Sequence, residues 1–536
     1  MSTQKIYRRT HLLRPLISRD QSCSPMMYRT LAIVALALVF SAHLAHAQHD
    51  DHEAVGEVQF EITCSDEAQE RFNEALSHLH HMMYSRAQSV FNEVIALDPE
   101  CAMGHWGVAM TSFQPLWAPT SDGDLQRGKA SVDAALRLGA DTEREAMHIA
   151  AVEAFFTDPD PPAADRPTDH RERIDAWKKA QRELHEAHPE DVDAAAFYAL
   201  ADISYAMTLF SPDEERDFSR ERRAGAMLEA YYEQHPAHPG IFHYLIHAYD
   251  SAELAHKAEE YARGYDQLAP DTPHALHMPS HIFVRMGMWE ETADWNKRSA
   301  EAALNHPYNG RVSLHYPHAL DYMMYAYLQM GAYEKAKETL DRLRTIDETQ
   351  PHFASAYAVA AGQARYFLEQ GLWGEAAELR TEYPATIDWD GYEGATALVH
   401  YARGLGAART GDLEQAAAER DAIEDLVASM RDAGNTYWAY MTEALQKAVG
   451  AWIRYEEGAT EDALTLMREA ADQEDSMDKH PITPGEVLPV RELYGEMLLK
   501  EDRQADAQRA FEASLERTPN RKHARRHIEQ IADAQP

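Results

Sequence analysis

Helical segments that recur at a fixed spacing constrain the fold of this chain more than any other feature. From Glu67 onward, Ala-rich amphipathic segments of 12–16 residues alternate with short polar breaks, which is typical of helices packed in pairs. A motif of the form Gly-x-(aromatic or Leu)-Glu-x-Ala marks the turns, and its glycines lie 40 residues apart at Gly331, Gly371 and Gly411. This is the spacing of a helix-turn-helix unit with a few extra loop residues. We find no convincing strand alternation, so the sequence predicts an all-α protein.

The first and last units resemble the tetratricopeptide repeat (TPR) family. The matching small and apolar positions are Ala75, Ala87, Phe91, Val94 and Pro99 in the first unit, and Gly495, Ala507, Phe511 and Pro519 in the last. The resemblance covers about residues 67–525 and implies a TPR-like helix-turn-helix solenoid, a right-handed superhelix with a concave groove. The physics agrees, because a single helix pair cannot bury its own apolar face and must stack on its neighbours.

Three strings are similar to those of a large group of exported bacterial TPR proteins with histidine-rich central repeats. They are residues 238–250 (HPGIFHYLIHAYD), 274–283 (HALHMPSHIF) and 101–107 (CAMGHWG). The similarity implies the fold and export, and it leaves the activity to be inferred from the residues themselves.

The N-terminus carries the features of a secretory signal. An apolar stretch at 31–40 follows Arg29 and precedes Ala45-His46-Ala47, so we expect cleavage after Ala47. Met26 or Met27, rather than Met1, would give a signal of conventional length. No later apolar run reaches the roughly 20 residues of a spanning helix. We therefore expect an exported protein, periplasmic or secreted, with no integral membrane segment after cleavage.

The pattern divides the chain into seven segments. They are a signal peptide (1–47), an N-terminal linker (48–66), N-terminal TPR-like repeats (67–157), a Pro-rich loop (158–170), degenerate helical repeats (171–235), histidine-rich TPR repeats (236–345) and C-terminal TPR repeats (346–536).

Charge narrows the range of partners. The chain has 51 Lys and Arg residues against 89 Asp and Glu residues, for a formal net charge of −38. Such a surface repels phosphate backbones and anionic bilayers, so we expect no nucleic-acid partner.

Only Cys64 and Cys101 remain after the predicted cleavage. In an oxidising compartment two cysteines favour one disulfide, which would join the entry of the first helical hairpin to the start of the second. Two buried free thiols, or a Cys/His metal site, are the alternatives.

Histidines concentrate in the middle of the chain. Residues 235–318 contain 11 of the 29 histidines, where an even distribution would place about four or five. Three units in this region open with a proline, at Pro239, Pro273 and Pro317, and proline suits the first helical position.

The register of these histidines predicts a shared face. The fourth and eighth residues after each proline are His243 and His247, then His277 and His281, then Asp321 and Tyr325. Residues four apart lie on one helix face. The residue after the proline adds His274 and His318, and Asp250 lies close by. In TPR proteins these offsets line the groove, so the resemblance implies that the side chains converge. Pro279 should kink this second helix or delay its start.

Two hypotheses follow. In the first, the groove binds a transition metal through His243, His247, His277 and His281, with His274, His318, Asp250 and Asp321 as alternate ligands or their hydrogen-bond partners. Copper is our first choice of metal and zinc or iron the alternative, and whether the protein is an enzyme is left open. In the second, the protein is a non-catalytic scaffold whose groove binds a peptide or small molecule. A second cluster, His78 to Tyr84 with His105 and Trp106 in the next unit, combines His and Met residues that suit copper, and the alternative, which we favour, is that His78 and His81 are turn and packing residues between two helices.

Overall fold

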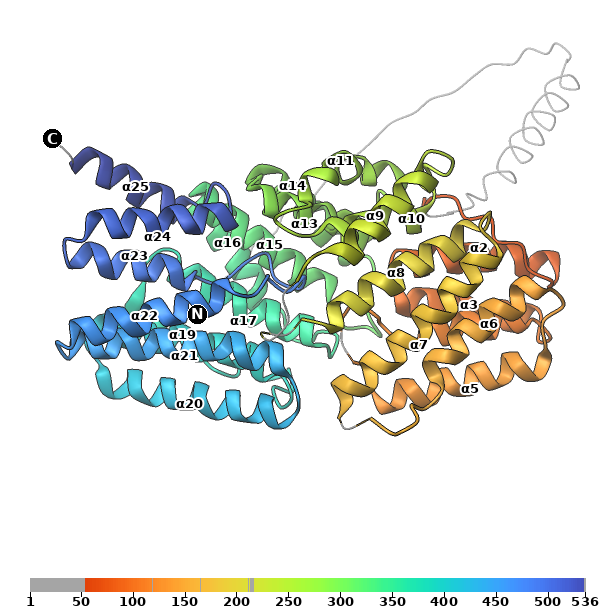
Figure 1. The fold of residues 1–536 in the computed structure, drawn as a ribbon, viewed down its shortest axis with the longest axis horizontal. Coiled ribbons are helices and arrows are strands. Elements are labelled where there is room, and N and C mark those ends of the chain that lie inside the picture. Colours follow the sequence, from red (N-terminus) through yellow and green to blue (C-terminus); the bar gives the residue numbers. More distant parts are fainter. Residues whose placement is uncertain (1–53, 118, 164, 211, 213–215, 535–536) are drawn as a thin grey trace, which may run out of the picture. The chain divides into compact units, whose positions relative to one another are not determined.

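The computed structural model describes residues 54–117, 119–163, 165–210, 212 and 216–534, which form α-helices joined by short connections (Figure 1). Those before the histidine-rich region are α2 (Asp66–His80), α3 (Tyr84–Leu97), α4 (Ala102–Met110), α5 (Asp122–Leu138), α6 (Glu143–Phe156), α7 (Arg166–Ala187), α8 (Val192–Thr208) and α9 (Ser219–Tyr232). Those of the histidine-rich region are α10 (Pro239–Tyr249), the 3₁₀ helix η1 (Ala255–Lys257), α11 (Glu259–Leu268), α12 (Pro273–His277), α13 (Pro279–Met286), α14 (Trp289–Ala303), α15 (His315–Met330) and α16 (Tyr333–Arg344).

The remaining helices are α17 (Phe353–Leu368), α18 (Trp373–Ala377), α19 (Glu393–Thr410), α20 (Leu413–Asp432), α21 (Thr436–Glu456), α22 (Thr460–Asp475), α23 (Val490–Lys500), α24 (Gln504–Arg517) and α25 (Lys522–Ala534). Within the described residues, β structure is limited to two isolated bridges, Tyr308 with Arg311 and Val312 with Thr349. None of the helices in this part of the chain is long and apolar enough to cross a bilayer.

The helices stack as repeated hairpins. Each packs against the next along the chain, and the first helices of successive hairpins also pack together, as in the series α15, α17, α19, α21 and α23. This is the arrangement of a TPR-like solenoid, and it confirms the predicted all-α fold class.

Local signals set many helix ends. The Ser65 side chain accepts a hydrogen bond from the amide of Ala68 at the start of α2, which satisfies an amide that the helix leaves free. Gly331 and Gly411 follow α15 and α19 with φ of 71° and 88°. Only glycine adopts this left-handed conformation without strain, so the recurrence of glycine in the turn motif has a backbone reason.

Two of the predicted segments are the signal peptide and the Pro-rich loop. The signal peptide, with its alternative starts at Met26 and Met27, lies outside the described residues. The loop predicted at 158–170 ends earlier, because α7 begins at Arg166 after the N-cap Asp165 and takes Pro167 into its first turn.

The buried side chains form two hydrophobic cores that meet in the histidine-rich region. One core runs from Val58 to Phe283 and the other from Val284 to Ile531. Helix α2 also packs against α10, and Gly240 permits this approach, because a Cβ there would lie 2.5 Å from Nδ1 of His80. The histidine-rich helices therefore lie between the two cores.

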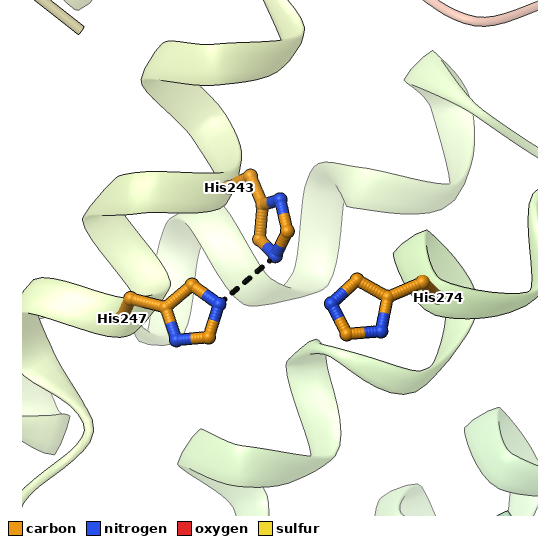
Figure 2. A group of neighbouring side chains, drawn as sticks. All are labelled: His243, His247 and His274. Carbon is orange, nitrogen blue, oxygen red and sulfur yellow. Dashed lines mark hydrogen bonds between the residues drawn. The ribbon is translucent and has the colours of Figure 1, made fainter. Parts of the chain in front are cut away.

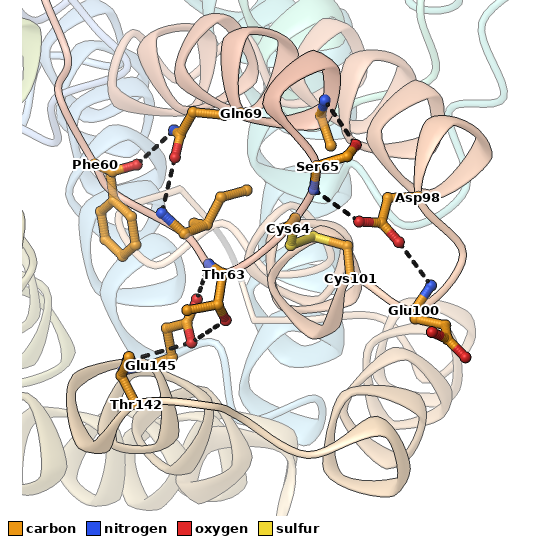
Figure 3. The surroundings of a disulfide bond; sticks show 12 residues. Phe60, Thr63, Cys64, Ser65, Gln69, Asp98, Glu100, Cys101, Thr142 and Glu145 are labelled. Carbon is orange, nitrogen blue, oxygen red and sulfur yellow. Dashed lines mark hydrogen bonds between the residues drawn. A yellow bond between two sulfur atoms is a disulfide. The ribbon is translucent and has the colours of Figure 1, made fainter.

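Cys64 and Cys101 form a disulfide that joins the segment before α2 to the residue before α4 (Figure 3). The chain around Cys64 is fixed by side chains from other elements: Glu145 accepts from the amide and hydroxyl of Thr63, and Asp98 accepts from the amide of Ser65. The predicted pairing is thus present, and neither cysteine is a free thiol or a metal ligand.

Replacing both cysteines, as C64S/C101S, should lower the free energy of unfolding of the N-terminal repeats by about 3–4 kcal/mol, the chain-entropy estimate for a loop of this size. Urea unfolding followed by far-UV circular dichroism measures the loss, and wild type in reductant should match the variant. Reaction of Cys64 or Cys101 with a thiol reagent in the native C23S protein would contradict the disulfide.

Candidate metal centre

Four helices carry the predicted site residues: α10, α12, α13 and α15. The expected break at Pro279 is present, since α12 ends at His277 and α13 begins at Pro279. Met278 between them keeps helical angles, with φ −53° and ψ −40°. The chain therefore continues in the same direction through the break, and His277 and His281 remain on one side.

His243, His247 and His274 form the first histidine group (Figure 2). One ring nitrogen of each lies within 4.8 Å of one on each of the others. Nε2 of His247 is 3.1 Å from Nε2 of His243, and Figure 2 shows the ring of His274 facing this pair from the opposite side. Both ring nitrogens of His274 are buried, and neither has a hydrogen-bond partner among the residues that the structure describes.

His277, His281 and His318 form the second group, under the same 4.8 Å limit. Nε2 of His277 is 3.0 Å from Nε2 of His281. His318 completes the group from α15, with its ring centroid 4.3 Å from that of His277, and its Nδ1 is buried without a partner.

Oxygen acceptors fix which nitrogen carries the proton in the second group. Nδ1 of His277 donates to Oδ1 of Asn296 at 2.7 Å, and that amide is oriented because its own Nδ2 donates to the carbonyl of Thr292. Nδ1 of His281 donates to Oδ2 of Asp250 at 2.8 Å. Both neutral rings therefore direct an Nε2 lone pair at the other across 3.0 Å.

The first group has one such anchor. Nδ1 of His243 donates to the carbonyl of His80 at 2.6 Å, so its Nε2 presents a lone pair toward His247. Ligating histidines usually donate their second ring N–H to a carbonyl or carboxylate in this manner.

Asp250 connects the second group to its surroundings. Its Oδ1 accepts from Nε of Arg285 at 2.9 Å and lies 3.6 Å from Nζ of Lys479. Burial raises the pKa of Asp250, but the charges of Lys479 and Arg285 outweigh that effect and hold it well below its usual range. Asp250 is therefore ionised and acts as the hydrogen-bond partner of a histidine, which is one of its two predicted roles.

The histidines lie inside the protein rather than on an open groove. Their side chains are at most 8% exposed, apart from the partly exposed His247. Segments distant in sequence cover them: Leu116 and Trp117 after α4, His352 before α17, and His480–Ile482 between α22 and α23. The hydroxyl of Tyr322 also donates to the carbonyl of Pro481 at 3.0 Å. These side chains share an inner helix face, and other elements fill the groove over it.

Residues of both groups line a small pocket of about 50 Å³. His247 and His274 line it from the first group, and His281 and His318 from the second. A space of this size holds a water-sized ligand.

Burial keeps these rings neutral. It lowers the pKa of His247 to about 3 and the pKa values of His243, His274, His277 and His318 well below the usual range, and the neighbouring histidines add to the effect. Neutral imidazole is the form that binds metals.

Asp321 is not part of either group, contrary to the prediction. Its Oδ1 is 3.2 Å from Nε of Arg365, and both side chains are fully buried. Arg365 also donates to the carbonyls of Gly485 and Glu486. The helical register placed Asp321 on the inner face correctly, but the buried guanidinium on α17 provides its partner.

A third group, formed by His80, His238 and Asp193, has a hydrogen-bond partner for each of its ring nitrogens. Asp193 accepts from Nε2 of His80 at 2.8 Å and from Nε2 of His238 at 3.2 Å. Nδ1 of His80 meets the Tyr244 hydroxyl, and Nδ1 of His238 accepts from the amide of Ile241. The ring nitrogens of this cluster all have partners with neutral rings, although its geometry meets the same 4.8 Å limit, so its hydrogen bonding is satisfied without a metal ion.

Several residues of the site were missed from the sequence. Asn296, His352, His480 and Trp117 lie outside the proline-based register. His352 shares one signal with His238, since each is the N-cap of an inner helix and accepts a backbone N–H there. Asn296, His480 and Trp117 carry no such signal, and only tertiary packing brings them to the candidate site.

Comparisons with known proteins give no family. No protein-family model and no curated protein match the chain. Among solved structures, yeast Tom70 is 11% identical with a TM-score of 0.37, over 87% of this chain and 95% of that chain. The Cut9–Hcn1 hetero-tetramer of the APC/C is 10% identical with a TM-score of 0.31, over 92% and 98%. The TPR domain of P58(IPK) is 10% identical with a TM-score of 0.22, over 87% and 98%. These scores are too low to bear on function, and the TPR-like fold is established by the helix packing itself.

Replacing Asp321 should lower the stability of the protein without changing the positions of the histidine side chains. D321N leaves Arg365 buried without its carboxylate and should lower the free energy of unfolding by about 3 kcal/mol. We choose the low end of the usual range because burial itself raises the pKa of Asp321 despite Arg365. Chemical denaturation measures the loss, with D341N, an exposed carboxylate paired with Lys337, as a control that should change by less than about 1 kcal/mol. An unchanged stability would contradict the buried ion pair.

Proposed function

We propose that this protein binds a transition-metal ion through its central histidine cluster. The observation that carries the proposal is the contact between His277 and His281, whose Nε2 atoms face each other at 3.0 Å while both Nδ1 protons are held by oxygen acceptors. Two lone pairs at that distance repel unless a cation lies between them or beside them.

A metal ion satisfies this arrangement better than a proton does. A shared proton would create an imidazolium in a site that water barely enters and where Lys479 and Arg285 are already positive. A metal at about 2.0–2.1 Å from each nitrogen would bring two ligand nitrogens to roughly the observed separation. His318 supplies a third nitrogen, and three imidazoles with one open position form a common type of reactive metal site.

The ligand chemistry supports copper first and zinc or iron next. All members of both groups are imidazoles, which suit these three metals, and Cu²⁺ binds nitrogen ligands most tightly of the divalent ions. We also propose that the protein works outside the cytoplasm, as the signal-like N-terminus indicates, and the Cys64–Cys101 disulfide supports an oxidising compartment.

Metal content provides the first test. Tag-free protein purified and then incubated with Cu²⁺ or Zn²⁺ should retain metal through gel filtration, measured by elemental analysis. H318F should retain at least one equivalent less. Since Nδ1 of His318 has no partner, the substitution removes a buried unsatisfied group, and the metal-free variant should melt at the same temperature as wild type or higher.

The matched control is H256A, which removes an exposed histidine in η1 and should retain the wild-type metal content. Folded wild-type protein that retains no metal, or H318F that loses stability and no metal, would contradict the proposal.

A neighbouring cavity supports the second candidate function, binding of a small ligand. It measures about 300 Å³ and shares Trp117 and Leu314 with the histidine cavity. The polar side chains in its lining are Tyr84, Ser85, Arg86, Gln114, Asn305, His306, Tyr308, Asn309, Ser313, His315 and Gln350, and the lining contains no carboxylate. In so acidic a protein, this composition favours a small polar molecule that carries hydrogen-bond acceptors, such as a carboxylate.

Thermal-shift measurements with a panel of small aliphatic and aromatic carboxylates test this candidate. A ligand at about 100 times its Kd should stabilise the protein by about 2.7 kcal/mol. S85W, which fills the cavity from an exposed position, should abolish the shift and leave the metal content unchanged. A shift that survives in S85W would place the ligand elsewhere.

A further inference from the structure

We propose that the cluster holds two metal ions, one in each histidine group, on either side of a shared ligand pocket. The inference rests on the proposed function and adds the number of ions, the division of ligands and the class of ligand that the centre takes.

Each histidine group is sufficient to hold an ion of its own. Each contains three imidazoles whose nearest nitrogens lie within 4.8 Å of one another. In the second group the Nε2 atoms of His277 and His281 face each other at 3.0 Å. In the first, Nε2 of His247 can donate to Nε2 of His243 at 3.1 Å, and His274 is the ring whose nitrogens have no partner among the described residues. A single ion bound by the second group would leave His274 without a ligand.

Unpartnered nitrogens occur in both groups. His274 in the first has two, and His318 in the second has one. In the third group, around Asp193, hydrogen bonds satisfy both histidines. Leaving a buried polar atom unpaired costs about 1–3 kcal/mol, and a ligand in each group would satisfy these atoms. Several histidines elsewhere have one unpaired nitrogen, but among the described histidines His274 is the one with both nitrogens buried and unpaired.

The two groups are direct neighbours. The ring centroids of His247 and His281 are 6.2 Å apart, and those of His274 and His277 are also 6.2 Å apart. Two ions bound in these groups would therefore be close enough for their unpaired electrons to couple.

The cavity lies where a bridging ligand would bind. Two histidines of each group line its wall, and its volume of about 50 Å³ admits a ligand of one to three heavy atoms. The six imidazoles are neutral, and the charge of Asp250 is offset by Arg285 and Lys479. Two divalent ions would thus lack compensating charge, which favours a small anion such as hydroxide in the cavity.

Copper titration of metal-free protein tests the inference directly. Wild type should bind two equivalents of Cu²⁺, H274F one, H318F one, and H274F/H318F none, by elemental analysis after gel filtration. H256A should bind two. Circular dichroism and thermal melting of the metal-free forms establish that each variant is folded, and H274L and H318L replace any phenylalanine variant that is not.

Electron paramagnetic resonance distinguishes adjacent ions from distant ones. Doubly loaded wild type should show a dipole-broadened spectrum with a half-field signal, and each single variant should give the spectrum of an isolated Cu²⁺. Azide, the probe for the cavity, should change the wild-type spectrum at one equivalent per two copper ions.

Results that contradict the two-ion inference can be distinguished from results that contradict the proposed function. One equivalent in wild type and none in either single variant would mean one ion shared by both groups, which overturns the two-ion inference and leaves the proposed function intact. Two equivalents with no magnetic coupling would place the second ion elsewhere and also overturn it. No retained copper in any folded form would overturn both.

Discussion

The carboxylate of Asp250 links three elements around the candidate site, which are the end of α10, helix α13 and the connection between α22 and α23. It follows the last residue of α10, accepts from His281 on α13, and pairs with Arg285 one turn further along that helix. Through Arg285 and Lys479 it also holds the connection between α22 and α23, since Arg285 pairs with Asp478 as well. One ionised side chain thus orients a candidate ligand and fastens a distant segment over it. Because removing one partner of a buried ion pair is strongly destabilising, the geometry of the histidines and the closure of the groove are linked energetically.

The histidines make this region an unfavourable place for a purely structural core. Buried polar atoms are normally paired, and the group around Asp193 shows that this chain can satisfy buried imidazoles completely. The two groups between the hydrophobic cores do not follow that rule, since three of their nitrogens lack partners among the described residues and the Nε2 atoms of His277 and His281 face each other at 3.0 Å with both Nδ1 protons held elsewhere. Exceptions to local rules gather at functional sites. The surrounding helices and the covering connection hold the rings in place, so the site is built before any ligand arrives.

The candidate site lies on the inner helices of the solenoid, and other segments cover it. TPR-like solenoids present side chains on their inner helices to a groove. Here Trp117, His352 and His480–Ile482 close that groove into a small cavity, beside a larger polar cavity that shares the Trp117 wall. A small pocket lined by largely buried side chains has limited contact with bulk water, which strengthens the electrostatic interactions within it.

The sequence by itself determined the repeat fold and much of the site. Turn glycines such as Gly331, the helix-starting prolines and the four-residue spacing of His243 and His247, or His277 and His281, are local features, so helix geometry alone placed those side chains on one face. Helix geometry does not specify what lies opposite that face. The anchoring of His277 by Asn296, the pairing of Asp321 with Arg365 and the covering of the groove by His480 depend on contacts between segments far apart in the chain. Tertiary structure alone decided these, because packing brings together residues whose sequence separation carries no periodic signal.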